Sequence, residues 1–126
     1  IDGRVHAIAD QCAHRGVALS VRPECYSKNT ISCWYHGFTY DFRDGKLVGI
    51  VTDPESALIG KIGIKSYPIE ERKNVVFIFI GDAEPHPIAL DLQPGFLDDN
   101  LAVADGGPLA GSHHAITIMC FADAYQ

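Results

Sequence analysis

The chain has 126 residues, is 47% hydrophobic and carries a formal net charge of -6. This length suffices for one domain with its own core, and no apolar run reaches the roughly 18 residues that a membrane span requires. With only ten Lys and Arg residues, the chain lacks the clustered positive charge of a nucleic-acid surface. We therefore expect a protein or a small molecule as partner, no nucleic acid and no membrane.

Short strand signals recur along the first eighty residues. Alternating, β-branched or aromatic stretches predict strands at 4–9, 30–35, 38–42, 46–52 and 75–80, the last of them buried. Asp44-Gly45 predicts a hairpin turn, because this pair tolerates the positive φ angles of tight turns. A single helical turn is expected from Pro54 to Gly60 and a polar turn at Lys73-Asn74. These patterns together predict an all-β fold.

Two motifs stand out within this pattern: Cys12-Ala13-His14 and, after residues 15–32, Cys33-Trp34-Tyr35-His36. Each offers one thiolate and one imidazole, and a glycine follows at once or one residue later. In a Rieske [2Fe-2S] centre, two His ligands replace two Cys ligands on one of the two irons. We therefore predict that Cys12, His14, Cys33 and His36 hold such a cluster, whose chemistry is one-electron transfer.

A zinc site is the competing interpretation of these four residues, because Cys2His2 sets also bind zinc in a tetrahedron. Zinc pairs usually run Cys-x2–4-Cys and then His-x3–5-His, whereas each pair here mixes the two residue types. A third alternative is that the four residues bind no metal. Spacing and ligand type favour the iron-sulfur cluster over both.

The chain resembles the N-terminal Rieske domain of ring-hydroxylating oxygenases, and within them the carbazole-type angular dioxygenases. The resemblance covers residues 1 to about 100 and rests on Cys12-Ala13-His14-Arg15-Gly16-Val17, Cys33-Trp34-Tyr35-His36-Gly37-Phe38-Thr39-Tyr40, Asp44-Gly45, Tyr67-Pro68-Ile69, Val76-Phe77-Ile78-Phe79-Ile80-Gly81-Asp82 and Phe96-Leu97-Asp98-Asp99.

The resemblance implies an antiparallel Rieske-type β-sandwich with a cluster-binding subdomain, as a fragment of a larger oxygenase subunit. It implies an oxidoreductase in which electrons pass from a reductase and a ferredoxin to the cluster. They would then pass to a mononuclear iron that hydroxylates an aromatic substrate with O2. It also implies a homotrimer for the full-length enzyme. We expect this fragment to lack the catalytic iron site, so no catalytic residue is assigned.

We expect a Rieske domain at residues 1–82 that lacks its first strand, since the chain opens in an Asp-Gly turn. Residues 83–100, with three prolines, are expected to be a linker toward an absent catalytic domain, and residues 101–126 a tail of unassigned role. His113, His114 and Asp123 in that tail are expected to be ordinary polar residues, not iron ligands.

Three other classes of Rieske protein can be compared with this pattern. Respiratory Rieske proteins carry an extra Cys in each cluster loop, and those positions are Val17 and Tyr35 here, so we expect no disulfide between the loops. With few polar donors expected near the sulfurs, the reduction potential of the cluster should lie at the low end of the Rieske range, at roughly -150 mV.

A stand-alone Rieske ferredoxin is the main alternative function, and a small nitrite reductase subunit is a weaker one. The linker expected after residue 82 favours the oxygenase over both.

The remaining cysteines, Cys25 and Cys120, are expected to be small buried hydrophobic residues. No secretory signal precedes the first motif, and we therefore expect the reducing cytoplasm as the compartment.

Overall fold

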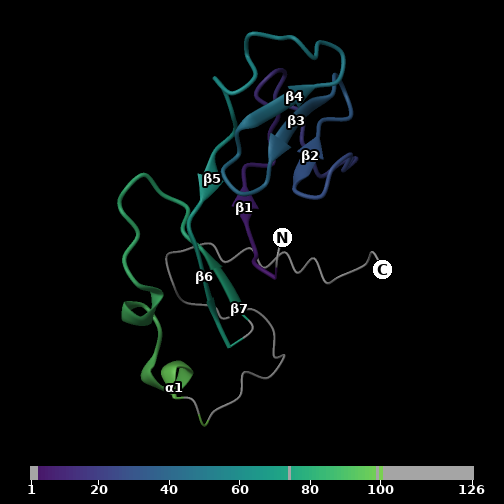
Figure 1. The fold of residues 1–126 in the computed structure, drawn as a ribbon. Coiled ribbons are helices and arrows are strands. Elements are labelled where there is room, and N and C mark those ends of the chain that lie inside the picture. The colour runs from purple at the N-terminus through teal and green to yellow at the C-terminus, as the bar shows by residue number, and fades with distance from the viewer. Residues whose placement is uncertain (1–2, 74, 99, 101–126) are drawn as a thin grey trace. The chain divides into compact units, whose positions relative to one another are not determined.

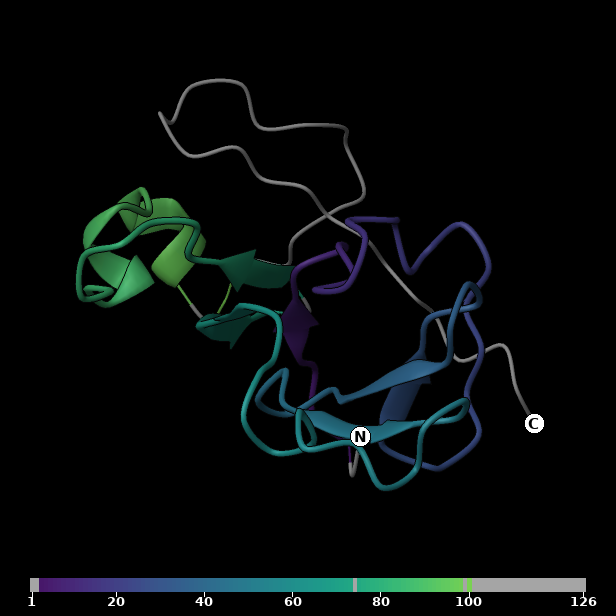
Figure 2. The same ribbon diagram turned by 90° about the horizontal axis from the view of Figure 1, so that it is seen from above.

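The computed structural model describes residues 3–73, 75–98 and 100, and the chain divides into two compact units, Ile1–Tyr67 and Pro68–Gln126. In the first unit, β2 (Thr30–Ser32), β3 (Phe38–Asp41) and β4 (Leu47–Ile50) form a sheet in chain order, and β1 (Ala7–Ile8) pairs with β5 (Ser66–Tyr67). Figure 1 labels these strands, and Figure 2 shows them from above. All of the pairings are antiparallel, which confirms the all-β prediction.

The core of the first unit lies against one face of this sheet. Side chains alternate between the two faces of a strand, and Phe38 and Tyr40 of β3 both point into the core, where Tyr40 is fully buried. Leu47 and Ile50 of β4 are buried beside them. The complete cluster of buried side chains is Cys12, Leu19, Ile31, Cys33, Phe38, Tyr40, Leu47 and Ile50. Both cysteines of the predicted site therefore belong to the hydrophobic core.

The predicted hairpin turn at Asp44-Gly45 is confirmed between β3 and β4. Gly45 has a φ of 73°, a left-handed conformation that glycine adopts without a steric penalty. A Cβ atom at this position would also collide with the Ile64 carbonyl oxygen. The turn thus requires glycine for its backbone conformation and for the close approach of a neighbouring segment.

The predicted helical turn between Pro54 and Gly60 is wrong. The N–H of Ser56 donates to the Asp53 carbonyl, and the N–H of Ile59 donates to the Ser56 carbonyl, both over 3.2 Å. Each of these hydrogen bonds links residues three apart, and the second bond begins at the residue where the first one ends. The segment therefore forms consecutive turns and no helical turn. Short polar turns of this kind and helix starts use the same residues, which is why the sequence did not separate them.

The expectation that Cys25 is buried is also wrong, because Cys25 is exposed. Its neighbour Glu24 forms a bridge to the fully buried Ser32. Since successive side chains in extended backbone point to opposite sides, the residue after Glu24 faces solvent. Cys120 lies outside the described residues.

The second unit contains a hairpin of β6 (Ile69–Arg72) and β7 (Val75–Ile78), a 3-10 turn at Ile88–Leu90 and the single-turn helix α1 (Pro94–Leu97). Its ring contact joins Phe77 to Phe96, with centroids 5.8 Å apart. The prediction of a buried strand at 75–80 is wrong in length and in burial. The strand ends at Ile78, and only Phe77 of β7 is buried. The other side chains are less covered because β7 pairs with β6 in a sheet of two strands.

Residues 83–100, predicted as a linker, include the 3-10 turn and α1. The N–H of Ile88 donates to the Glu70 carboxylate over 3.1 Å, so this stretch is anchored to β6. The domain limits expected from the sequence stay a proposal, and residues 101–126, with His113, His114 and Asp123, lie outside the described residues. In the part of the chain that the structure describes, no helix is long and apolar enough to span a membrane.

The ion pair at the end of β3 allows a prediction about stability. Asp41 is 8% exposed, and Arg43 donates to its carboxylate from the backbone N–H over 2.8 Å and from the guanidinium over 2.5 to 3.2 Å. The guanidinium hydrogen bonds hold the pKa of Asp41 at about 2, below its usual value of 3.8. Because the folded state has the lower pKa, the ion pair contributes stability above about pH 4, and this contribution is lost as the pH falls toward 2.

We expect Asp41→Asn to reduce the free energy of unfolding at pH 7 by about 1 kcal/mol, since the half-exposed Arg43 is screened by solvent. Urea unfolding at pH 7 and pH 2.5 measures the effect, and the difference from wild type should shrink at the lower pH. Asp53→Asn, which changes an exposed carboxylate in the same unit, is the control. An equal loss at both pH values would contradict the assigned role of the ion pair.

Candidate cluster-binding site

The two predicted motifs form loops with the same backbone closure. In each loop the cysteine N–H donates to the carbonyl five residues later, over 2.9 Å from Cys12 and 2.8 Å from Cys33. In return, the glycine four residues after the cysteine donates its N–H to the cysteine carbonyl, over 2.8 Å from Gly16 and 2.9 Å from Gly37. The loops therefore match each other although one has a Cys-x-His and the other a Cys-x-x-His spacing.

Both closing glycines have left-handed backbone, with a φ of 70° at Gly16 and 71° at Gly37. A Cβ atom at Gly37 would lie 2.5 Å from the Cβ of Val51, and one at Gly16 would lie 3.2 Å from the Gln11 side-chain nitrogen. Real Cβ atoms do not approach another carbon to 2.5 Å, so Gly37 in particular cannot be replaced without moving Val51 or opening the loop.

The structure brings the four predicted residues together in two pairs. Cys12 and Cys33 are each 2% exposed, and burial, together with the neighbouring Cys12 thiol, raises the pKa of Cys33. The rings of His14 and His36 meet edge to face with centroids 4.7 Å apart. The site thus has a buried thiol pair at one end and an imidazole pair at the other.

The imidazole pair is the more accessible end of the site. His14 is exposed and His36 is half-buried, and the His14 ring stacks on Phe38 with centroids 4.8 Å apart and planes 10° from parallel. Desolvation, followed by the charges of His36 and Arg15, lowers the pKa of His14. A lowered pKa favours the neutral imidazole, which is the form that binds a metal.

One buried atom tests directly whether these residues fit a metal cluster. The Nδ1 atom of His36 is buried and has no hydrogen-bond partner. A buried polar atom without a partner costs about 1–3 kcal/mol, and an iron ligated at this nitrogen would remove that cost. Two thiols, two imidazoles and this unsatisfied nitrogen fit the ligand set of a Rieske [2Fe-2S] cluster.

Among the residues that the structure describes, no three His, Cys, Asp or Glu side chains are grouped around one ion position. A two-iron cluster does not require such a group, because each iron takes two protein ligands.

Tyr40 contacts the candidate site, a position that the sequence analysis did not assign to it. Its hydroxyl accepts the Ala13 N–H over 3.0 Å and lies 3.2 Å from the Cys12 Sγ. Because the oxygen already accepts from Ala13, its proton is available to Cys12. Burial raises the pKa of Tyr40, so the hydroxyl stays protonated at neutral pH. The strand alternation that places Tyr40 in the core was readable, but its partner 28 residues away was not.

This hydroxyl also bears on the expectation that few polar donors reach the cluster sulfurs. Tyr40 supplies one donor at Cys12 in the described part of the chain. Hydrogen bonds to the sulfurs are among the factors that set the reduction potential of an iron-sulfur cluster. The low reduction potential stays a prediction, and the Tyr40 hydrogen bond has to be taken into account in it.

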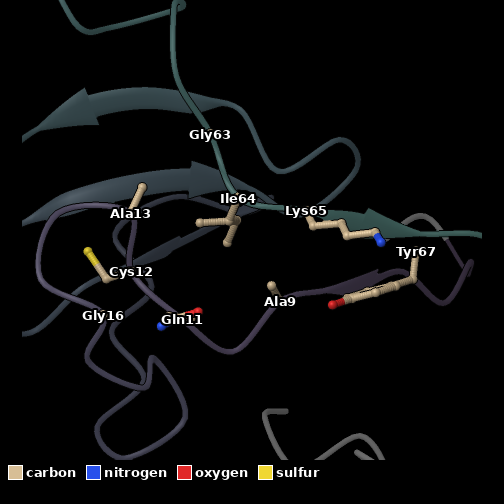
Figure 3. Close-up of a pocket in the computed structure, with 9 residues that line it drawn as sticks. All are labelled: Ala9, Gln11, Cys12, Ala13, Gly16, Gly63, Ile64, Lys65 and Tyr67. Atoms are coloured by element: carbon tan, nitrogen blue, oxygen red, sulfur yellow. The ribbon is translucent and has the colours of Figure 1, made fainter. Parts of the chain in front are cut away.

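A pocket of about 530 Å³ borders the outer side of the first loop, and Figure 3 shows its lining. The Cys12 side chain points away from the Tyr67 end of this pocket. At that end the Lys65 ammonium lies 5.4 Å from the centre of the Tyr67 ring. The pocket thus borders the first ligand loop, because Cys12, Ala13 and Gly16 belong to its lining.

The chain is similar in sequence and in fold to known oxygenase components. The chain is 56% identical over 103 residues to the terminal oxygenase component of carbazole 1,9a-dioxygenase from Sphingomonas sp., which covers 82% of this chain and 27% of that protein. The terminal oxygenase structure from Novosphingobium sp. KA1 is 61% identical, with a TM-score of 0.78 over 81% of this chain and 27% of that one.

A second similar structure is the reduced complex between oxygenase and ferredoxin in carbazole 1,9a-dioxygenase, which is 52% identical with a TM-score of 0.74 over 79% of this chain and 25% of that one. The chain thus spans about a quarter of the length of these relatives. The Rieske [2Fe-2S] domain family matches residues 1–68. More than half of the sequence is covered by this match, and the chain belongs to the Rieske [2Fe-2S] domain family.

Proposed function

We propose that this chain is the electron-transfer domain of a terminal oxygenase of the carbazole 1,9a-dioxygenase type, with Cys12, His14, Cys33 and His36 as the cluster ligands. The observation that carries the proposal is the pair of matching loops, which present two buried thiols, two adjacent imidazoles and the unpaired Nδ1 of His36. The [2Fe-2S] cluster, when bound, supplies one-electron transfer.

Each residue of the site has its own proposed role in binding the cluster or in giving a partner access to it. Cys12 and Cys33 would hold one iron inside the core, where water is excluded, and His14 and His36 would hold the other. The exposed His14 provides a partner protein with access to the imidazole end. Tyr40 keeps a proton beside Cys12 and also fixes the first loop through the Ala13 N–H.

The similar proteins support a proposal for the partners. One of the similar structures is a complex of the oxygenase with ferredoxin, so we propose a ferredoxin as the direct electron donor and a reductase upstream of it. A mononuclear iron and the aromatic substrate would be bound by oxygenase sequence that this chain does not cover, in a homotrimer. We propose the cytoplasm as its location, consistent with the reducing conditions that free thiols require.

The first test is the spectroscopic signature of the reconstituted chain. We expect a red-brown protein that gives a rhombic EPR signal after reduction with dithionite, because mixed thiolate and imidazole ligation localises the added electron on the His-bound iron. His14→Ala and His36→Ala should each abolish the signal, whereas His86→Ala, in the second unit, should leave it unchanged. Stoichiometric zinc without iron in protein purified anaerobically would contradict the proposal.

The second test concerns catalysis. We expect the cluster-loaded chain, chemically reduced and supplied with iron, carbazole and O2, to form no dihydroxylated product. Ring hydroxylation requires an iron held by two His and one carboxylate with open positions, and the described residues contain no such group. Product analysis by chromatography, against a cluster-free control, checks this. Product above the control would show that the chain itself holds a catalytic iron.

The third test concerns Tyr40. We expect Tyr40→Phe to lower the cluster potential by about 40–80 mV, which corresponds to about 1–2 kcal/mol for the lost hydrogen bond. The sign follows because a donor at Cys12 stabilises the more negative, reduced cluster. Protein-film voltammetry measures the shift, and Tyr26→Phe, which changes an exposed tyrosine of the same unit, is the matched control. An unchanged potential in Tyr40→Phe would exclude the proposed donor role.

A further inference from the structure

The loop that carries His36 is fastened by the turn that follows β4. The N–H of Val51 donates to the Gly37 carbonyl over 2.9 Å. The hydroxyl of the next residue, Thr52, donates to the His36 carbonyl over 3.1 Å. Two successive carbonyls of the ligand loop are therefore bonded to two successive residues of this turn.

The Gly37 carbonyl has a second donor within the sheet. The Thr39 hydroxyl lies 3.2 Å from this carbonyl and 2.7 Å from the hydroxyl of the fully buried Ser32. Loss of one donor at Gly37 would thus leave another in place. The contact to the His36 carbonyl comes from the Thr52 side chain and can be removed by substitution without touching the sheet.

The two ligand loops are held in different ways. In the first loop, the Tyr40 hydroxyl holds the Ala13 N–H from within the core. In the second loop, the exposed Thr52 holds the His36 carbonyl from outside. The His36 backbone sets the direction of its ring, and Nδ1 of that ring is the buried atom without a hydrogen-bond partner. A small rotation of this peptide would move that nitrogen.

We infer that Thr52 is a positioning residue for His36, a role that rests on the proposed cluster. Its hydroxyl fixes the peptide at His36 so that Nδ1 faces the iron position. Hydrogen-bonding partners outside the ligand set orient metal ligands, and their loss typically costs about 10-fold to 100-fold in metal affinity. An exposed hydrogen bond contributes little to global stability, so a merely structural Thr52 would leave the cluster spectrum unchanged.

The test compares Thr52→Val, which keeps the branched shape and removes the donor, with Thr52→Ser, which keeps the hydroxyl. Val48→Thr, at an exposed position of β4, controls for changes to the strand. The readouts are the EPR line shape and g anisotropy of the reduced 126-residue chain, its reduction potential and the rate of cluster loss to a chelator. We expect Thr52→Val to change the EPR anisotropy and to lose its cluster about 10-fold faster, while Thr52→Ser and Val48→Thr match wild type.

Each other outcome has a definite meaning. A Thr52→Val protein with the EPR spectrum, potential and cluster loss of wild type overturns the inference and leaves the proposed function standing. A Thr52→Ser protein as impaired as Thr52→Val also overturns it, because the hydroxyl would not be the cause. If Thr52→Val fails to fold, Thr52→Ala removes the same donor and is judged in the same way. A wild-type chain without a Rieske signal overturns the proposed function and this inference together.

Discussion

The structure depends on the placement of two thiols side by side inside the hydrophobic core. Cys12 and Cys33 are each 2% exposed, and burial there disfavours the negatively charged thiolate that a metal requires. Iron bound by these thiols, as we propose, would supply the compensating positive charge, and the core would then depend on the cluster it encloses. The rest of the first unit, from the closing glycines to the three-stranded sheet, serves to bring two distant loops to this one place.

Strand β3 is the main element that holds the two ligand loops together, because it contacts both of them. Its first residue, Phe38, accepts the N–H of Cys33 and stacks on the His14 ring, and Tyr40 reaches back to the first loop at Cys12 and Ala13. The alternation of β3 places both aromatic side chains on the core face. A shift of the strand by one residue would turn both of them to the opposite face and separate the loops, so the register of β3 determines the geometry of the site.

The sequence was sufficient for features that depend on local spacing and insufficient for those that depend on register. The Asp44-Gly45 turn, which the structure confirms, follows from a short motif. The prediction of the four ligands rests on short motifs of the same kind. Tyr40 and Thr52 contact residues 28 and 16 positions away along the chain, and only the folded arrangement of β3 and the loops brings these residues together. The charged strand β6, Ile69–Arg72, was missed because its pairing with β7 overrides its weak intrinsic preference for a strand.

The two ends of the site differ in a way that suits electron transfer. The thiol end is enclosed by apolar side chains, which lowers the local dielectric and strengthens the effect of a single donor such as Tyr40 on the sulfur charge. The imidazole end meets the surface at His14, where a partner can approach without entering the core. In the function we propose, the hydrogen bond from Tyr40 would act at the thiol end, and a partner protein would approach at the imidazole end. Changes at the two ends therefore reach the site through different loops, and β3 links these loops because it contacts both of them.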